Sequence, residues 1–191
     1  MKRILLAAFF VMVLAPAAWA QVPFVPSFEF GAGGGLNFPM GGIGDGMNNG
    51  YNFNASLGYS VAPMFTVGAE LGFFGSGASD ETLALLGTGA DFSMSSIQFT
   101  AMAKYKVPLA IHNLYAKGLA GGYRTATDLT SGLGNFDASS TNFGFGIGGG
   151  FQFNGFKSSS IYTEGIYHRI SGASSDGEFV TVNLGVMFSL N

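Results

Sequence analysis

The chain has 191 residues, which predicts one domain, and no cysteine, which excludes disulfides, thiolate metal sites and the acylated cysteine of a lipoprotein. Only 10% of the residues are charged and 15% are aromatic, a composition that disfavours a water-soluble surface. The net charge of −3 comes without a basic stripe, which excludes a nucleic-acid binder.

The first 20 residues have the pattern of a cleaved secretory signal. A positive start, Lys2-Arg3, is followed by an apolar stretch over residues 4–14 and by the small residues of Ala18-Trp19-Ala20. An apolar stretch of 11 residues is too short for a membrane anchor, which needs about 20. We expect cleavage after Ala20 and a mature domain over residues 21–191, whose six basic and 11 acidic residues give a net charge of −5.

Eight segments of the mature chain alternate apolar and polar side chains with period two, which is the signal of a β-strand. In the clearest segment, Phe53 and Leu57 share one face, and Asn52 and Asn54 share the other. A helix is disfavoured because glycine-rich stretches such as residues 146–150 would cost it about 1 kcal/mol per glycine. In chain order the segments are residues 28–37, 51–61, 65–73, 97–105, 114–124, 142–153, 160–170 and 180–190.

The apolar faces of these segments are expected to contact lipid. Eight inward faces of Phe, Tyr and Leu would overfill a barrel whose interior is just wide enough for side chains. The opposite faces carry mainly Gly, Ser, Asn and Thr, which fit a narrow lumen. Ten or eleven residues tilted by about 45° rise about 25 Å, the height of the lipid-facing band of an outer-membrane barrel. The following tyrosines near strand ends suit the membrane interface: Tyr51, Tyr59, Tyr105, Tyr162 and Tyr167.

The connections alternate between long and short, as in barrels with short periplasmic turns and longer outer loops. The predicted fold is therefore an all-β, closed, antiparallel, up-and-down transmembrane β-barrel with eight strands, ten being the alternative. The long connections are residues 38–50, 75–92 and 125–140, the short ones are residues 62–64 and 154–159, and residues 107–113 and 171–177 are intermediate.

The last segment carries a family resemblance. Its Asn-Leu-Gly-Val-Met-Phe-Ser-Leu sequence resembles the assembly signal of outer-membrane barrels, with Asn183, Gly185, Phe188 and Leu190 at the defined positions. Over essentially the whole mature chain, strand number, turn alternation and this signal resemble the small barrels of the OmpA/OmpX type. The resemblance implies export, recognition by the barrel-assembly machinery, an outer-membrane location and contact with outer-membrane lipid and lipopolysaccharide. No peptidoglycan-binding domain is expected after the last strand.

Five charged residues fall on the inward faces: Glu29, Glu70, Lys104, Lys117 and Glu164. Unpaired charges in a narrow interior are costly, so we expect these residues to pair. The main hypothesis is a structural charge network that plugs the lumen. The alternative, suggested by the resemblance to OmpA-like barrels, is a gate whose pairs exchange to pass ions.

The predicted outer loops are acidic, and acidic loops could hold divalent cations that bridge to lipopolysaccharide phosphates. They lack the Asp-x-Asp-x-Asp-Gly spacing of a calcium loop, so solvated loops are favoured and neither a metal nor a cofactor is predicted. Residues 82–86 form an apolar patch, interpreted as rim packing, with a short helix or a partner contact as alternatives. The loop acids are Asp45, Asp80, Glu81, Asp91, Asp128, Asp137 and Asp176.

One group of residues hints at an enzyme. His168, Ser171 and Glu178 resemble the His, Ser and acid that outer-membrane lipid A deacylases carry on adjacent final strands. The family's His-x-Ser spacing puts both side chains on one strand face, whereas residues three apart face opposite ways. We therefore predict no catalytic residue and place His168 at the interface or in the lumen.

The sequence thus predicts a non-enzymatic outer-membrane barrel with a structural, envelope-integrity or surface-interaction role, carried by outer loops that meet an unidentified surface partner. Three alternatives remain open: a small gated channel or porin, a lipid A-modifying enzyme, and a soluble periplasmic ligand-binding barrel.

Overall fold

The computed structural model describes residues 25–44, 46–86, 90–109, 111–131, 134–155, 158–172 and 177–190. The predicted signal segment and its cleavage site lie outside these residues, as do the loop acids Asp45 and Asp176.

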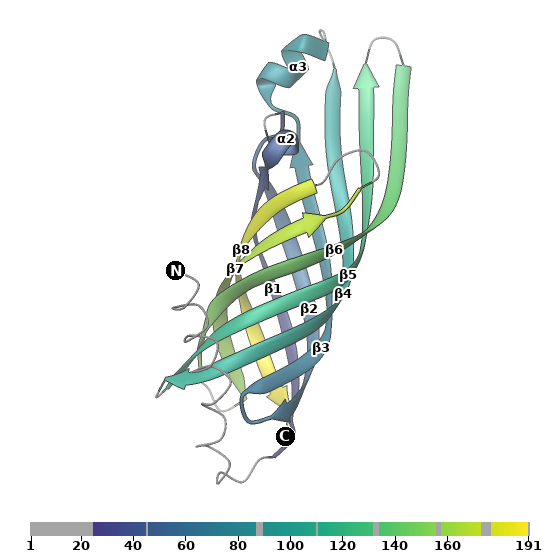
Figure 1. Cartoon of the computed structure of the whole chain (residues 1–191). Coiled ribbons are helices and arrows are strands. Elements are labelled where there is room, and N and C mark those ends of the chain that lie inside the picture. The colour runs from purple at the N-terminus through teal and green to yellow at the C-terminus, as the bar shows by residue number, and fades with distance from the viewer. Residues whose placement is uncertain are drawn as a thin grey trace, which may run out of the picture.

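Eight antiparallel strands form a closed barrel in chain order (Figure 1), as the sequence predicts. Each strand pairs with its chain neighbour, and the last strand closes the ring on the first, from Phe28 opposite Leu190 to Met40 opposite Glu178. The strands are β1 (Phe28–Met40), β2 (Gly50–Ala62), β3 (Phe65–Gly77), β4 (Asp91–Leu109), β5 (His112–Ser131), β6 (Gly134–Phe153), β7 (Ser159–Ile170) and β8 (Gly177–Leu190).

The two faces of the strands are occupied as the alternation predicts. Large apolar side chains point outward, with Phe99 65% and Leu184 64% exposed, whereas the polar Gln98 and Thr100 are fully buried inside. Tyr162 corrects one prediction, because it lies in the lumen and donates to Asn54 Oδ1 at 2.8 Å instead of joining an interfacial girdle. Its even-numbered position puts it on the same strand face as Glu164.

Three strands are much longer than predicted. β4 has 19 residues and β5 and β6 have 20 each, so the predicted loop over residues 125–140 is mostly a paired hairpin. In Figure 1 these strands continue well past the ends of β7 and β8. Their upper parts are rich in Ser, Thr and Asn, and their few apolar residues, such as Phe92 and Phe136, lie on the inward face. The membrane segments have their apolar residues on the outward face, which is why periodicity alone did not extend the strands.

Two short helices lie in the other long connections, α2 (Gly41–Gly44) and α3 (Asp80–Leu86). The α3 helix includes the whole apolar patch of residues 82–86, which is the short-helix alternative for that segment. Its N-terminus is capped by Ser79, whose Oγ accepts from Thr82 N at 3.3 Å, and Asp80 and Glu81 lie in its first turn. Neither helix has the length and apolarity needed to cross a membrane.

Glycines on the inward faces let neighbouring strands and lumen side chains come close. Gly148 lies opposite Lys117 on one side and Ile166 on the other. A Cβ at this position would collide with the Gly165 carbonyl oxygen and lie 2.7 Å from Ile166 Cα, closer than real Cβ contacts allow. Gly118 on the outward face of β5 has open space at the same position.

This difference gives a matched pair of variants. Gly148→Ala is expected to lower the free energy of unfolding in lipid vesicles by about 1–3 kcal/mol, because overpacking displaces backbone. Gly118→Ala is expected to change it by less than about 0.5 kcal/mol. Urea titration followed by heat-modifiable gel migration measures both, and equal stability of the two variants would contradict the close approach at Gly148.

Candidate functional site

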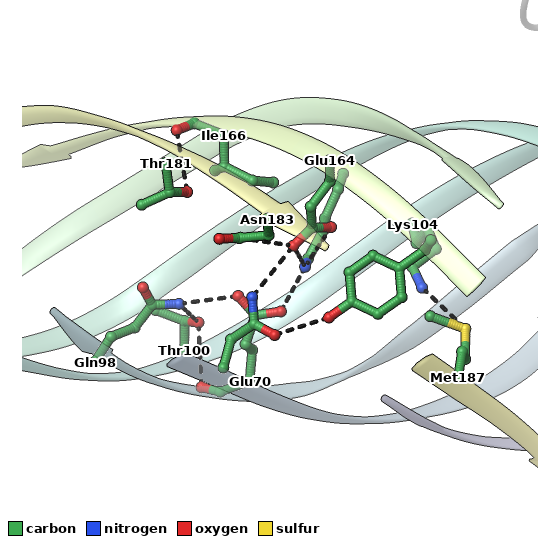
Figure 2. Close-up of polar contacts among 12 residues, drawn as sticks. Glu70, Gln98, Thr100, Lys104, Glu164, Ile166, Thr181, Asn183 and Met187 are labelled. Atoms are coloured by element: carbon green, nitrogen blue, oxygen red, sulfur yellow. Dashed lines mark hydrogen bonds and ion pairs between the residues drawn. The ribbon is translucent and has the colours of Figure 1, made fainter. Parts of the chain in front are cut away.

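Lys117 is the centre of one charge cluster inside the barrel. Its Nζ lies 2.5 Å from Glu70 Oε2 and 3.0 Å from both carboxylate oxygens of Glu164. Tyr115 and Asn183 also donate to Glu164, at 2.9 and 3.3 Å, and Gln98 donates to Glu70 at 3.4 Å. Figure 2 shows Glu70 and Glu164 approaching each other from facing walls of the lumen. The cluster therefore links opposite sides of the barrel through one ammonium group.

A second cluster lies nearer the end at which β1 begins. Glu29 pairs with Lys104 at 3.8 Å and forms a close ion pair with Lys106. Lys104 Nζ also lies 3.7 Å from Met187 Sδ and 5.0 Å from the centre of the Tyr115 ring. The prediction missed Lys106 because the predicted strand ended at residue 105, although Lys106 continues the inward period of Lys104.

All five charged residues predicted for the lumen are thus found there, each at most 5% exposed. Their ion pairs form two groups, Lys117 with Glu70 and Glu164, and Glu29 with Lys104. Tyr115 connects the groups, since it donates to Glu164 and its ring lies 5.0 Å from Lys104 Nζ. When Lys106 is included, the part of the chain that the structure describes places three acidic and three basic side chains in the lumen.

Apolar side chains fill much of the remaining lumen, which the prediction of small polar inward residues did not include. One buried group is Phe74, Tyr123, Ile170 and Phe179, and another is Met102, Leu119 and Ile166. The space between the first group and the tip of the barrel measures about 30 Å³. That volume is enough for a few water molecules at most, so this part of the lumen leaves little free space beside Phe74 and Phe179.

His168 packs against the first of these two buried groups, on Phe74, Tyr123 and Phe179. Its Nδ1 lies 3.1 Å from the Tyr123 hydroxyl, its Nε2 lies 3.3 Å from Thr181 Oγ1, and its ring stacks on Phe179 with centroids 4.6 Å apart. Both ring nitrogens therefore have partners other than Ser171 and Glu178. Glu178 instead lies 3.7 Å from Arg169 Nε. The arrangement gives a hydrolytic triad no support.

The residues of the predicted assembly signal occupy both faces of β8. Asn183 points into the lumen beside Glu164, and Phe188 and Leu190 face outward with 44% and 64% exposure. A Cβ on Gly185 would lie 2.5 Å from the Ala32 carbonyl oxygen and from the Tyr162 ring. Gly185 therefore has a packing role, and recognition of this strand by an assembly machinery stays a prediction.

Beyond the end of β7, β4, β5 and β6 continue as an extension made of residues 91–96, 125–131 and 134–143, called here the protruding sheet, and β3 flanks its β4 side up to Gly77 opposite Ser93. Its inner face, which continues the lumen side, carries Phe92, Leu129 and Phe136 opposite one another. Phe136 is 76% exposed. The outer face carries Asp91, Asp128 and Asp137, with the last two directly opposite each other. The protruding sheet is therefore amphipathic.

The described loop acids do not lie together in a metal site. Asp80 and Glu81 begin α3, and Asp91, Asp128 and Asp137 lie in the protruding sheet. Among the described residues, no group of three or more His, Cys, Asp or Glu side chains is arranged to hold a metal ion.

The chain is similar to known outer-membrane barrels. The family model of the outer membrane protein β-barrel domain matches residues 4–189. Neisserial surface protein A has a TM-score of 0.60 at 14% identity, covering 86% of this chain and 99% of that one. A major outer membrane protein from Thermus thermophilus has a TM-score of 0.61 at 13% identity, covering 87% and 100%.

A third similar structure is Ail, the attachment invasion locus protein of Yersinia pestis, in complex with the heparin analogue sucrose octasulfate. Its TM-score is 0.55 at 20% identity, covering 86% of this chain and 97% of that one. No curated protein sequence matches the chain.

The Lys117 cluster predicts strong coupling between buried charges. Lys117→Met leaves two buried carboxylates without their base and is expected to lower the free energy of unfolding by about 3–5 kcal/mol. Adding Glu70→Gln and Glu164→Gln should restore part of that loss. Glu178→Gln is the control, because its pair with Arg169 is largely exposed and should contribute less than about 1 kcal/mol.

Urea unfolding in lipid vesicles of the single and combined variants gives the coupling free energies. Coupling below about 0.5 kcal/mol for both Lys117 pairs would show that water, and not Lys117, compensates the two carboxylates.

Proposed function

Because the chain belongs to the outer membrane protein β-barrel domain family, we propose that it acts at the cell surface and binds a partner through the protruding sheet. The observation that carries this proposal is the length of β4, β5 and β6. A strand needs about 9–11 residues to cross the membrane, whereas these strands have 19 or 20. About half of each strand therefore serves something other than crossing lipid.

The filled lumen supports a surface role over conduction. Lys117 connects the facing acids Glu70 and Glu164, and the aromatic group around His168 packs between this cluster and the tip. A water-filled pore of this size would require these groups to separate. A protruding sheet requires no such rearrangement to meet a partner.

The exposed apolar surface also points to binding. Phe136 is 76% exposed, and it aligns with Leu129 and Phe92 into a row across three strands. Single exposed apolar residues are ordinary, but aligned ones outside the lipid band are typical of contact surfaces. An envelope-integrity role based on the barrel alone would give this row no purpose.

The acidic outer face makes a polyanion an unsuitable partner. Ail was solved with a sulfated heparin analogue, whereas the protruding sheet of this chain presents Asp91, Asp128 and Asp137. Complementary potentials favour association and like charges oppose it. We infer a partner that is neutral or basic where it meets the sheet.

Shortening the β5–β6 hairpin tests the proposed function. In the shortened chain, residues 127–138 are replaced by Asn-Gly, a two-residue turn that suits a hairpin. Cells displaying the intact chain should attach to surfaces coated with a basic protein, and the shortened chain should reduce attachment at least tenfold, to the level of cells without it. The control coating is an acidic protein, and heat-modifiable migration verifies that both barrels fold.

Equal attachment by the intact and shortened chains, with both barrels folded, would contradict a binding role for the protruding sheet. The function would then lie in the barrel and the remaining loops.

A further inference from the structure

A groove crosses the outward wall of the barrel between β4 and β8. Its floor is a row of small residues in which Ala116 lies opposite Gly149, and Gly149 lies opposite Gly165. Tyr105 continues the row at one end and Val182 at the other. The hollow measures about 540 Å³, which is within the range of small-molecule sites. In Figure 1 the strands β4, β5 and β6 cross the near wall of the barrel at a slant.

Larger side chains form a ridge on either side of this floor. On the side of the short turns, Leu114 lies opposite Phe151 in the next outward row. On the other side, Ile147 lies opposite Tyr167. Leu114 is 48% and Ile147 63% exposed, as expected of side chains that contact lipid. The groove is therefore a depression within the lipid-facing band and not a gap between strands, which stay paired beneath it.

The lipid side of the groove is apolar. Among the described residues that line it, Glu164 is the only charged one, and it points into the lumen, where Tyr115 donates to it at 2.9 Å. A polar ligand would lose its hydration in the groove without gaining an ion pair. The lining therefore fits a hydrocarbon chain.

The glycine at position 165 leaves space that the chain itself does not use. A Cβ on Gly149 would lie 2.8 Å from the Tyr115 carbonyl oxygen, so the close approach of β5 requires a glycine there. Gly165 is different, because a Cβ at that position would find Thr181 O at 4.0 Å as its nearest neighbour. A side chain would fit at Gly165, and its absence keeps the groove open. Open space beside an apolar wall loses dispersion contacts unless another molecule fills it.

The groove rises through half of the membrane. Opposite residues, followed from Phe28 around the ring through all eight strands, lead back to β1 at Phe38, ten residues nearer the long loops. Each row therefore climbs toward the long loops as the strand number increases. From Tyr105 to Val182 the floor crosses four strand spacings of about 4.8 Å and, at a tilt of about 40°, rises about 12 Å. Half of the lipid-facing band of an outer-membrane barrel has the same height.

We propose that this groove binds one acyl chain of a phospholipid of the periplasmic leaflet, with the headgroup beside Tyr105 and the end of the chain near Val182. The groove continues the lipid-contacting surface of the barrel, so lipid is the molecule that reaches it. Its floor begins on the side of the short turns, the periplasmic side in barrels of this family, and rises by the height of one leaflet. A tyrosine at its lower end suits the membrane interface. This site is independent of the protruding sheet and of the partner proposed for it.

A second copy of this chain is a poorer occupant of the groove. The floor extends around the convex wall of the barrel over five strands, from Tyr105 on β4 to Val182 on β8. A second convex barrel would meet this wall along a narrow line and leave most of the floor uncovered. A flexible acyl chain follows the curvature and covers the whole floor.

Native mass spectrometry of the full chain, extracted from membranes in mild detergent, tests the proposal. The probe is a phosphatidylethanolamine with two long saturated chains, and we expect the folded barrel to retain one molecule of it. A phosphatidylethanolamine with two short chains, which cannot extend from Tyr105 to Val182, should be retained at least tenfold less. The headgroup is the same in both probes, so the difference measures recognition of the chain.

Variants of the floor identify the binding position. Gly165→Leu places a side chain in the groove from β7, and Ala116→Leu does so from β5. Each should lower the fraction of barrels that retain the long-chain phospholipid at least fivefold. Gly122→Leu is the matched control and should change that fraction less than twofold, because Gly122 also has open space at its Cβ but does not line the groove. Heat-modifiable migration verifies that each variant folds, and Ala116→Leu decides if Gly165→Leu does not.

Three results would overturn the inference: no retained phospholipid on the intact chain, equal retention of the long-chain and short-chain probes, or retention by the groove variants equal to that of Gly122→Leu. Retention of lipopolysaccharide in preference to phospholipid would overturn it as well, because the occupant would then belong to the outer leaflet. Dimers of the intact chain that Gly165→Leu separates would show that a second copy fills the groove, which also contradicts the proposal.

Discussion

Closure of eight strands into a ring is the constraint on which the rest of this structure depends, because it leaves a lumen only as wide as the side chains that fill it. Inside that lumen there is little water to compensate a charge. Lys117 accordingly serves Glu70 and Glu164 together, and Glu29 serves two lysines. Gly148 reflects the same constraint, since a methyl group there would collide with the neighbouring strand. The lumen is a packed core with charged members.

Strand faces are predictable from the sequence because their period is a local property. Glu29, Glu70, Lys104, Lys117 and Glu164 were placed inside correctly for that reason. The ion pairs are not local: Lys117 and Glu164 are 47 residues apart, and their meeting depends on the register of two strand pairs, β5–β6 and β6–β7. The same period also places Lys106 and Tyr162 inside. Lys106 was missed because the predicted strand ended one residue before it, and Tyr162 was missed because tyrosines near strand ends were assigned to the membrane interface.

The period of the sequence did not predict the protruding sheet, and the reason is physical. Outside lipid, neither face of a strand must be apolar, so Ser, Thr and Asn replace the alternation that marks the membrane segments. Pairing with neighbours then continues through β4, β5 and β6, while β7 ends at Ile170. Because of this difference in length, the two halves of the long strands have different roles. The lower half of the long strands completes a closed, filled barrel. The upper half gives the chain an ordered surface in which residues 135–142 of β6 have a strand neighbour only on the β5 side among the described residues.

Residue-resolved hydrogen exchange of the intact chain in lipid nanodiscs tests this account most directly. Amides of residues 136, 138, 140 and 142 point toward β5 and should exchange slowly. Amides of residues 135, 137, 139 and 141 point to the side on which pairing with β7 has ended at Gly144, and they should exchange fast. This alternation, above a barrel whose amides are uniformly protected, is the predicted result. Uniformly fast exchange over residues 125–143 would show that the hairpin is not an ordered sheet, and uniform protection would show that its edge is already covered.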